Sequence, residues 1–93
     1  MGTFHQNKDP LHGITVVVDT PGPEIWIGRC DDVIGGDVIL LDADRHQDGE
    51  GGRSKSEWVS RAAQVGHWAR HARVVVPRDA VASIRRLGEI ETP

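Results

Sequence analysis

The sequence predicts a mainly β domain with one helix, folded as a small five-stranded barrel. Three observations favour this fold class. Valine and isoleucine together number 18 whereas leucine numbers 4, and β-branched side chains suit a pleated sheet better than a helix. Short apolar runs alternate with turns rich in Pro, Gly and Asp. A chain of 93 residues also has room for one small domain only.

Three strands are expected in the first half of the chain. Residues 14–18 form a β-branched run that ends at the turn sequence DTPGP, residues 19–23. In this turn, Pro fixes φ and Gly allows a positive φ. The second strand covers residues 25–30. After a Gly-Gly turn, residues 37–42 carry a continuous apolar run and form the third strand, which we expect to be covered on both faces.

A helix is expected after a polar loop at residues 44–53. Ser54 and Glu57 have the spacing of a capping box, in which each satisfies a backbone N–H of the other. The next apolar residues recur on one helical face: Trp58, Ala62, Val65 and Ala69. We therefore predict a helix over about residues 55–71, inserted between strands three and four.

Two further strands, over residues 73–76 and 80–87, flank the corner Pro77-Arg78-Asp79. The element order is thus β-β-β-α-β-β. A small, strongly bent sheet of five short strands is best satisfied by a barrel, and a closed or half-closed barrel hides the edges of such strands. The expected organisation is a flexible arm over residues 1–12, one barrel domain over 13–88 and a tail over 89–93.

Composition excludes several classes of protein. No run approaches 18 apolar residues, so we expect no membrane partner, and residues 1–10 lack the apolar core of a secretory signal. The single cysteine, Cys30, excludes an intrachain disulfide and an all-cysteine zinc site, and we expect a buried, inert thiol. These features predict a cytoplasmic protein. A chain this short buries only roughly 60–65% of its unfolded surface, which favours a homo-oligomer.

Charge is divided along the chain. Residues 1–52 carry three basic and ten acidic residues, whereas residues 53–88 carry eight basic and two acidic ones, although the whole chain has a net charge of −3. Two oppositely charged halves can complement each other within the fold or between subunits. The alternative is that the basic half binds nucleic acid.

Three segments resemble Sm-like proteins of the LSm and Hfq type. Residues 16–30 (VVVDTPGPEIWIGRC) resemble the family's first two strands, with Gly28 at its strand-two glycine. Residues 37–43 (DVILLDA) look like the third strand, with Asp37 at the usual Asn, and residues 74–84 (VVVPRDAVASI) are similar to the second Sm motif. The chain also resembles a group of short uncharacterised bacterial proteins with a D-T-P…I-G…D-A-D-x-H pattern, which brings no activity with it.

The resemblance implies an Sm/SH3-like barrel whose fourth and fifth strands pair with neighbouring subunits to form a ring. The implied interface residues are Val74, Val75, Val76, Val81 and Ile84. Rings of this family bind single-stranded RNA near the loops that hold the Asn of the first motif and the Arg-Gly of the second, which correspond to Asp37 and Arg78. Among the other basic residues of the second half, Arg85 and Arg86 join this candidate interface.

The chain departs from the family pattern in three respects. Asp37 replaces the Asn, and a carboxylate repels phosphate and carbonyl groups. Pro77-Arg78 stands where Arg-Gly is usual. Tyrosine is absent and aromatic residues make up 4% of the chain, so platforms for base stacking are scarce.

Two groups of residues have spacings that occur in metal sites. Asp44, His46 and Asp48 begin like a calcium-binding EF-hand loop, but Lys55 occupies the position of the final Glu. His67 and His71 are four residues apart, which on a helix brings two imidazoles to one ion. The alternatives are a solvated acidic loop and a pair of surface histidines. The candidate metal ligands are therefore Asp44, His46, His67 and His71.

No nucleophile, phosphate-binding or dinucleotide-binding motif is present. We therefore expect no catalytic residue, no cofactor and no enzymatic activity. The first hypothesis is a non-enzymatic assembly or adaptor module that self-associates through strand edges, with an unknown protein partner. The second is a ring that binds single-stranded RNA. A metal-binding protein is the weaker alternative.

Overall fold

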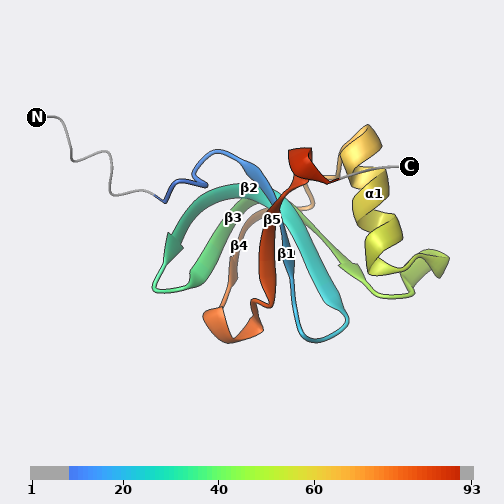
Figure 1. The fold of residues 1–93 in the computed structure, drawn as a ribbon, viewed down its shortest axis with the longest axis horizontal. Helices are drawn as coiled ribbons and strands as arrows, with labels where there is room; N and C mark the ends of the chain where they lie inside the picture. Colours follow the sequence, from blue (N-terminus) through green and yellow to red (C-terminus); the bar gives the residue numbers. More distant parts are fainter. Residues whose placement is uncertain (1–8, 91–93) are drawn as a thin grey trace, which may run out of the picture.

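The computed structural model describes residues 9–90. Its element order is β-β-β-α-β-β, as predicted, with short 3-10 helices (η) in the connections (Figure 1). The elements are β1 (Thr15–Asp19), β2 (Glu24–Ile34), β3 (Asp37–Gln47), η2 (Glu50–Gly52), α1 (Lys55–Val65), β4 (His71–Val76), η3 (Arg78–Ala80), β5 (Ser83–Arg86) and η4 (Leu87–Glu89).

The strands form one antiparallel sheet in the order β4-β3-β2-β1-β5. The sheet is curved, but β4 pairs only with β3 and β5 only with β1. The prediction of a closed barrel is therefore wrong. Pro77 and η3 carry the chain from one end of the sheet to the other, and no ladder joins the two short end strands within residues 9–90.

The curvature of the sheet depends on a close approach between β2 and β3. A Cβ atom at Gly28 would lie 2.9 Å from Cβ of Ala43 and 3.2 Å from Cβ of Leu40, so only glycine fits there without a shift. The pairing register also slips by one residue between Ile27 and Arg29. Opposite this slip, Asp42 has a positive φ of 51°, as expected for the extra residue of a β-bulge.

The concave face of the sheet encloses the larger core. Its buried residues come from four strands, and Trp26, Val74 and Ile84 pack around them. Alternation along each strand places these side chains on one face. The buried residues are Val16, Val18, Cys30, Val38, Leu40, Ala43 and Val76.

A second core lies on the convex face, beneath α1 and η4. Val17 of β1, together with Ile25 and Ile27 of β2, packs against Val59 and Ala62 of α1. β1 is therefore apolar on both faces because both faces are covered. This packing shows that α1 lies against the sheet instead of projecting from it.

The start of α1 was predicted correctly and its end was not. Ser54 caps the helix, and its side chain and that of Glu57 form the expected capping box. The helix ends at Val65 because Gly66 has a φ of 91° and leaves the helical conformation. Ala69 consequently lies outside the helix, and Val65 is 70% exposed instead of packing against the sheet.

The predicted polar loop at residues 44–53 begins four residues later, at Asp48, because β3 continues to Gln47. Alternation explains the difference: Asp44 and His46 are buried on the convex face, whereas Arg45 is exposed. β2 likewise extends to Ile34. The last predicted strand is shortened to residues 83–86, because residues 78–80 form η3.

The predicted arm is described only from Asp9 onward, since residues 1–8 lie outside the described residues. The Asp9 N–H donates to Asp32 Oδ1 over 3.1 Å, and Leu11 packs against the concave core. Residues 9–12 therefore contact the sheet. At the other end, Ile90 packs on the convex core, and residues 91–93 lie outside the described part.

Candidate assembly edges and nucleic-acid interface

Within residues 9–90, the two end strands, β4 and β5, each have one edge to which no strand is paired. The six-residue β4 forms five residue pairs with β3 on its other side, and the four residues of β5 pair with β1. An unpaired edge presents a row of free N–H and C=O groups that can add a further strand. The molecule thus carries two different edges at opposite ends of one curved sheet.

The predicted interface residues divide between these edges and the core. Val74 and Val76 point into the concave core, and Val76 is 2% exposed. Val75 points the other way and is 45% exposed. Ile84 lies on β5 and contacts the core, whereas Val81 lies in the turn before β5. Val75 is therefore the apolar edge residue most open to a partner.

Asp37 and Arg78, 41 residues apart in sequence, are in direct contact. The Arg78 backbone N–H donates to Asp37 Oδ1 over 2.7 Å. Gly36, with a φ of 92°, allows this approach, because a Cβ atom there would lie 2.6 Å from Cδ of Arg78. The Arg78 side chain itself is 74% exposed, and its Nε lies 3.9 Å from Oδ1 of the exposed Asp79, so an anion at this corner would compete with a surface ion pair.

Arg85 and Arg86 lie elsewhere, on the β5 edge. Arg86 is paired in register with Val16 and Arg85 with Val17. Since Val16 faces the concave core and Val17 the convex core, the two arginines point to opposite faces. Arg86 also lies 3.9 Å from a Glu89 carboxylate oxygen. The four predicted nucleic-acid residues thus form one contacting pair and two separate positions.

The candidate metal ligands are distributed over three segments. Asp44 and His46 lie on β3, where each is 4% exposed. His67 follows α1, and its Nε2 lies 3.0 Å from the Asp42 carbonyl oxygen. His71 begins β4, with its ring 5.6 Å from that of Trp26. The predicted helical pairing of His67 and His71 is therefore wrong. Residues 9–90 contain no group of three or more His, Cys, Asp or Glu side chains arranged to hold one metal ion.

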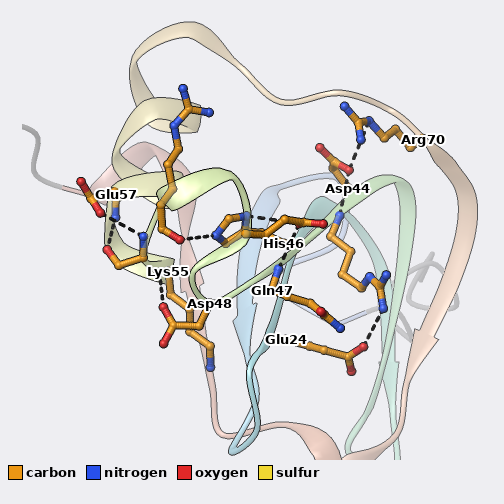
Figure 2. Close-up of polar contacts among 12 residues, drawn as sticks. Glu24, Asp44, His46, Gln47, Asp48, Lys55, Glu57 and Arg70 are labelled. Carbon is orange, nitrogen blue, oxygen red and sulfur yellow. Dashed lines mark hydrogen bonds and ion pairs between the residues drawn. The ribbon is translucent and has the colours of Figure 1, made fainter.

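Asp44 and His46 have protein partners instead (Figure 2). Asp44 accepts the Arg45 backbone N–H and lies 3.7 Å from Arg70 Nε. The His46 ring stacks on Trp58 with centroids 5.2 Å apart. The sequence did not predict the approach of Arg70 to Asp44, the stacking of His46 on Trp58 or the role of Gly36. Each of these contacts joins segments that only the fold brings together.

Among residues 9–90, two ion pairs join the oppositely charged halves within one chain. Lys55 Nζ lies 2.7 Å from Asp19 Oδ1, and Arg70 reaches Asp44. Both pairs connect the α1 region to the acidic β strands. Part of the predicted complementarity is therefore used inside the fold.

Cys30 is fully buried. Burial raises the pKa of its thiol, and the carboxylates of Asp9, Asp32 and Asp31 raise it further. The thiol thus stays protonated and unreactive. In the described part of the chain, no helix has the length and apolar character that a membrane span requires.

Comparison with known proteins identifies the fold. No protein-family model and no curated protein matches the sequence. Among solved structures, the Pyrococcus abyssii Sm protein in complex with a uridine heptamer is similar, with a TM-score of 0.56 and 21% identity over 82% of this chain and 86% of that one. A chain of the NatC complex bound to CoA is also similar, with a TM-score of 0.54 and 20% identity over 81% of this chain and 77% of that one. A chain of the NatC complex bound to Gag peptide and CoA gives the same TM-score and identity. The chain therefore has an Sm-like fold.

Proposed function

We propose that this chain is a non-enzymatic Sm-like module that assembles with copies of itself through its two sheet edges. The observation that carries the proposal is the placement of β4 and β5 at opposite ends of one curved sheet. When β4 of one copy pairs with β5 of the next, one unused β4 and one unused β5 remain, at the two ends of the chain of copies. Such a head-to-tail contact continues until the rotation closes it into a ring.

Side chains support the same contact. Val75 is 45% exposed on β4, and a neighbouring strand would cover it. The side chains of Val74 and Val76 pack into the concave core. They hold β4 in place, so its edge belongs to a fixed strand. Neither β4 (HARVVV) nor β5 (SIRR) contains proline, so no backbone N–H is missing from either edge when a further strand is added.

The oligomeric state of two matched variants tests this proposal. Val75→Lys places a charge on the β4 edge, and Val65→Lys makes the same change on α1, where Val65 is 70% exposed. Light scattering after size exclusion should show a multimer for the wild type and for Val65→Lys, and a smaller species for Val75→Lys. A monomeric wild type at about 100 μM would refute the proposal, since weak homotypic contacts still populate at that concentration.

Single-stranded RNA binding is the second candidate function. The contact between Asp37 and Arg78 favours it, because it assembles the two loops that the family resemblance assigns to RNA. The similar Pyrococcus abyssii Sm protein was solved with a uridine heptamer, which is consistent with this role. The exposed guanidinium of Arg78 would contact phosphate, and the Asp37 carboxylate is engaged by a backbone N–H.

Binding of a uridine heptamer measured by fluorescence anisotropy at several salt concentrations tests the RNA role. Loss of one phosphate contact in Arg78→Ala should weaken binding several-fold and reduce the slope of log K against log salt by about 0.7. Arg29→Ala is the matched control, because Arg29 pairs with Asp42 on another part of the sheet. Equal loss in both variants would show non-specific attraction and contradict a site at Arg78.

A further inference from the structure

A cleft beneath α1 is not used by either proposed function. We call it the α1 cleft: a cavity of about 420 Å³ between the end of β3, α1 and residues 66–70. Its volume lies within the range typical of small-ligand sites. It lies on the convex face, under a helix inserted between β3 and β4, and neither Asp37 nor Arg78 lines it.

The floor of the α1 cleft is rigid and polar. His46 is 4% exposed, and its Nε2 lies 2.9 Å from the carbonyl oxygen of Arg53. Because a carbonyl only accepts, Nε2 carries the hydrogen and the ring orientation is fixed. The ring also stacks nearly parallel to Trp58, at an interplanar angle of 12°. Two residues along β3, Asp44 presents a carboxylate that is 4% exposed.

The walls of the cleft carry an excess of positive charge. Four arginines line it, against the two carboxylates of Asp44 and Glu50: Arg45, Arg53, Arg61 and Arg70. Arg45 pairs with Glu24, and Arg70 lies 3.7 Å from Asp44, whereas Arg53 and Arg61 form no ion pair with another residue in the described range 9–90. Two guanidinium groups that line the cleft are therefore available for an anion.

Trp68 supplies an aromatic surface to the cleft. It lies in the connection between α1 and β4, lines the cleft as Asp44 does, and is 70% exposed. An exposed indole beside a polar cleft is a stacking surface for a planar ligand. The contact of His67 with the Asp42 carbonyl ties this connection to β3.

We infer that the α1 cleft binds a nucleoside phosphate, either as a free nucleotide or as one unit of single-stranded RNA. The phosphate contacts Arg53 and Arg61, and the base stacks on Trp68. The base faces Asp44 because that carboxylate repels phosphate and accepts from base N–H groups. Guanine, which presents adjacent N–H donors, should therefore bind more tightly than uracil. The inference does not depend on assembly through the sheet edges.

Titration of the full chain with guanosine 5′-phosphate and uridine 5′-phosphate, followed by NMR, tests this inference. The guanosine nucleotide should shift the indole signal of Trp68 and the amide signals of Arg61 and Gly66. Arg61→Ala should weaken its binding at least about tenfold, as expected for loss of a charged hydrogen bond, and Trp68→Ala at least about fivefold. Trp68→Phe should retain most of the affinity, because it keeps a stacking ring. Arg29→Ala is the matched control, because Arg29 pairs with Asp42 and does not line the cleft, and it should change the affinity by less than about twofold.

The outcomes separate the sources of the ligand and decide the inference. If Arg61→Ala weakens binding of the pentamer UUGUU as well as of the nucleotide, the cleft takes a unit of RNA. If it weakens only the nucleotide, the ligand is free. The absence of shifts at about 5 mM guanosine 5′-phosphate, a concentration that reveals even millimolar affinity, would overturn the inference. Shifts centred on Asp37 and Arg78, or tighter binding of the uridine nucleotide, would overturn it too.

Discussion

Replacement of Gly28 by alanine tests the physical cause of the sheet's curvature. The added Cβ would lie 2.9 Å from Cβ and 3.1 Å from Cα of Ala43, and 3.2 Å from Cβ of Leu40. The contact with Cβ of Ala43 is shorter than real Cβ atoms tolerate. Cα of Ala43 belongs to the backbone, and the two Cβ atoms are bound directly to it, so none of the three atoms can move without the backbone. The strands must therefore separate, at a cost of about 1–3 kcal/mol for overpacking.

A second effect has the opposite sign, which makes the test sharp. Gly→Ala at a position with ordinary φ stabilises a protein by about 0.4–1 kcal/mol, because the unfolded chain loses freedom. If Gly28 were an ordinary strand residue, Gly28→Ala would be stabilising. If the contact with Ala43 decides, the variant is destabilised by about 1–2 kcal/mol, which lowers the Tm of a chain this size by roughly 4–16 °C.

Urea unfolding of a double-mutant cycle measures the contact directly. Ala43→Gly removes the nearest atom, so Gly28→Ala should cost at least about 1 kcal/mol less in that background than in the wild type. All four proteins must be compared at one concentration, because association shifts apparent stability. A stabilised Gly28→Ala variant, with additive effects in the cycle, would refute this account of the bend.

Three further predictions concern α1 and the concave core. Lys55→Ala should lower the free energy of unfolding by about 1 kcal/mol in thermal denaturation, because Lys55 Nζ donates to Asp19 Oδ1 and to two carbonyl oxygens of the β1–β2 turn. Hydrogen bonds from the backbone N–H and side chain of Ser54 lower the pKa of Glu57. The stability that they contribute is present above the ordinary Glu pKa of 4.5 and is lost as the pH falls through the lowered value. The fall in Tm on acidification should therefore be smaller in Glu57→Gln. Cys30 should react with a thiol reagent only at the rate of unfolding, and rapid labelling of the native protein would contradict its burial.

Local signals predicted the fold wherever a short segment decides its own structure. The capping box at Ser54 and Glu57 marks the start of α1, and β-branched runs mark the strands. The helix predicted over about residues 55–71 runs through Gly66, yet the positive φ of that residue ends the helix. Local signals do not distinguish a glycine tolerated inside a helix from one that ends it, because tertiary contacts decide.

For the candidate sites too, the sequence indicated some contacts and could not indicate others. The family resemblance assigns Asp37 and Arg78 to the loops of one RNA site; the structure brings the two residues into contact, and the RNA site itself stays a prediction. Asp44 and His46 looked like loop residues because they are polar, and only the helix above them makes their burial favourable. Partners such as Arg70 and Trp58 lie 26 and 12 residues away in sequence. Nothing in the spacing indicates these contacts, so the α1 cleft was not predicted.

The charges on the sheet edges lead to one more prediction. Neither β4 (HARVVV) nor β5 (SIRR) contains an acidic residue. Arg73 pairs in register with Leu41 and Arg85 with Val17, so both arginines point to the convex face. Pairing of β4 with β5 of a neighbour therefore places like charges on one face, where opposed pairs cost about 0.2–1 kcal/mol each.

Salt should then act in opposite directions on the two proposed functions. Screening shortens the reach of charge from about 10 Å at 0.1 M to about 3 Å at 1 M salt, so self-association should strengthen by about two- to fivefold over that range. RNA binding should weaken over the same range, because counterion release opposes it. Sedimentation of the free protein and anisotropy with a uridine heptamer, in the same buffers, measure both. If self-association weakens with salt, opposite charges must hold the copies together, and the contact must lie away from β4 and β5.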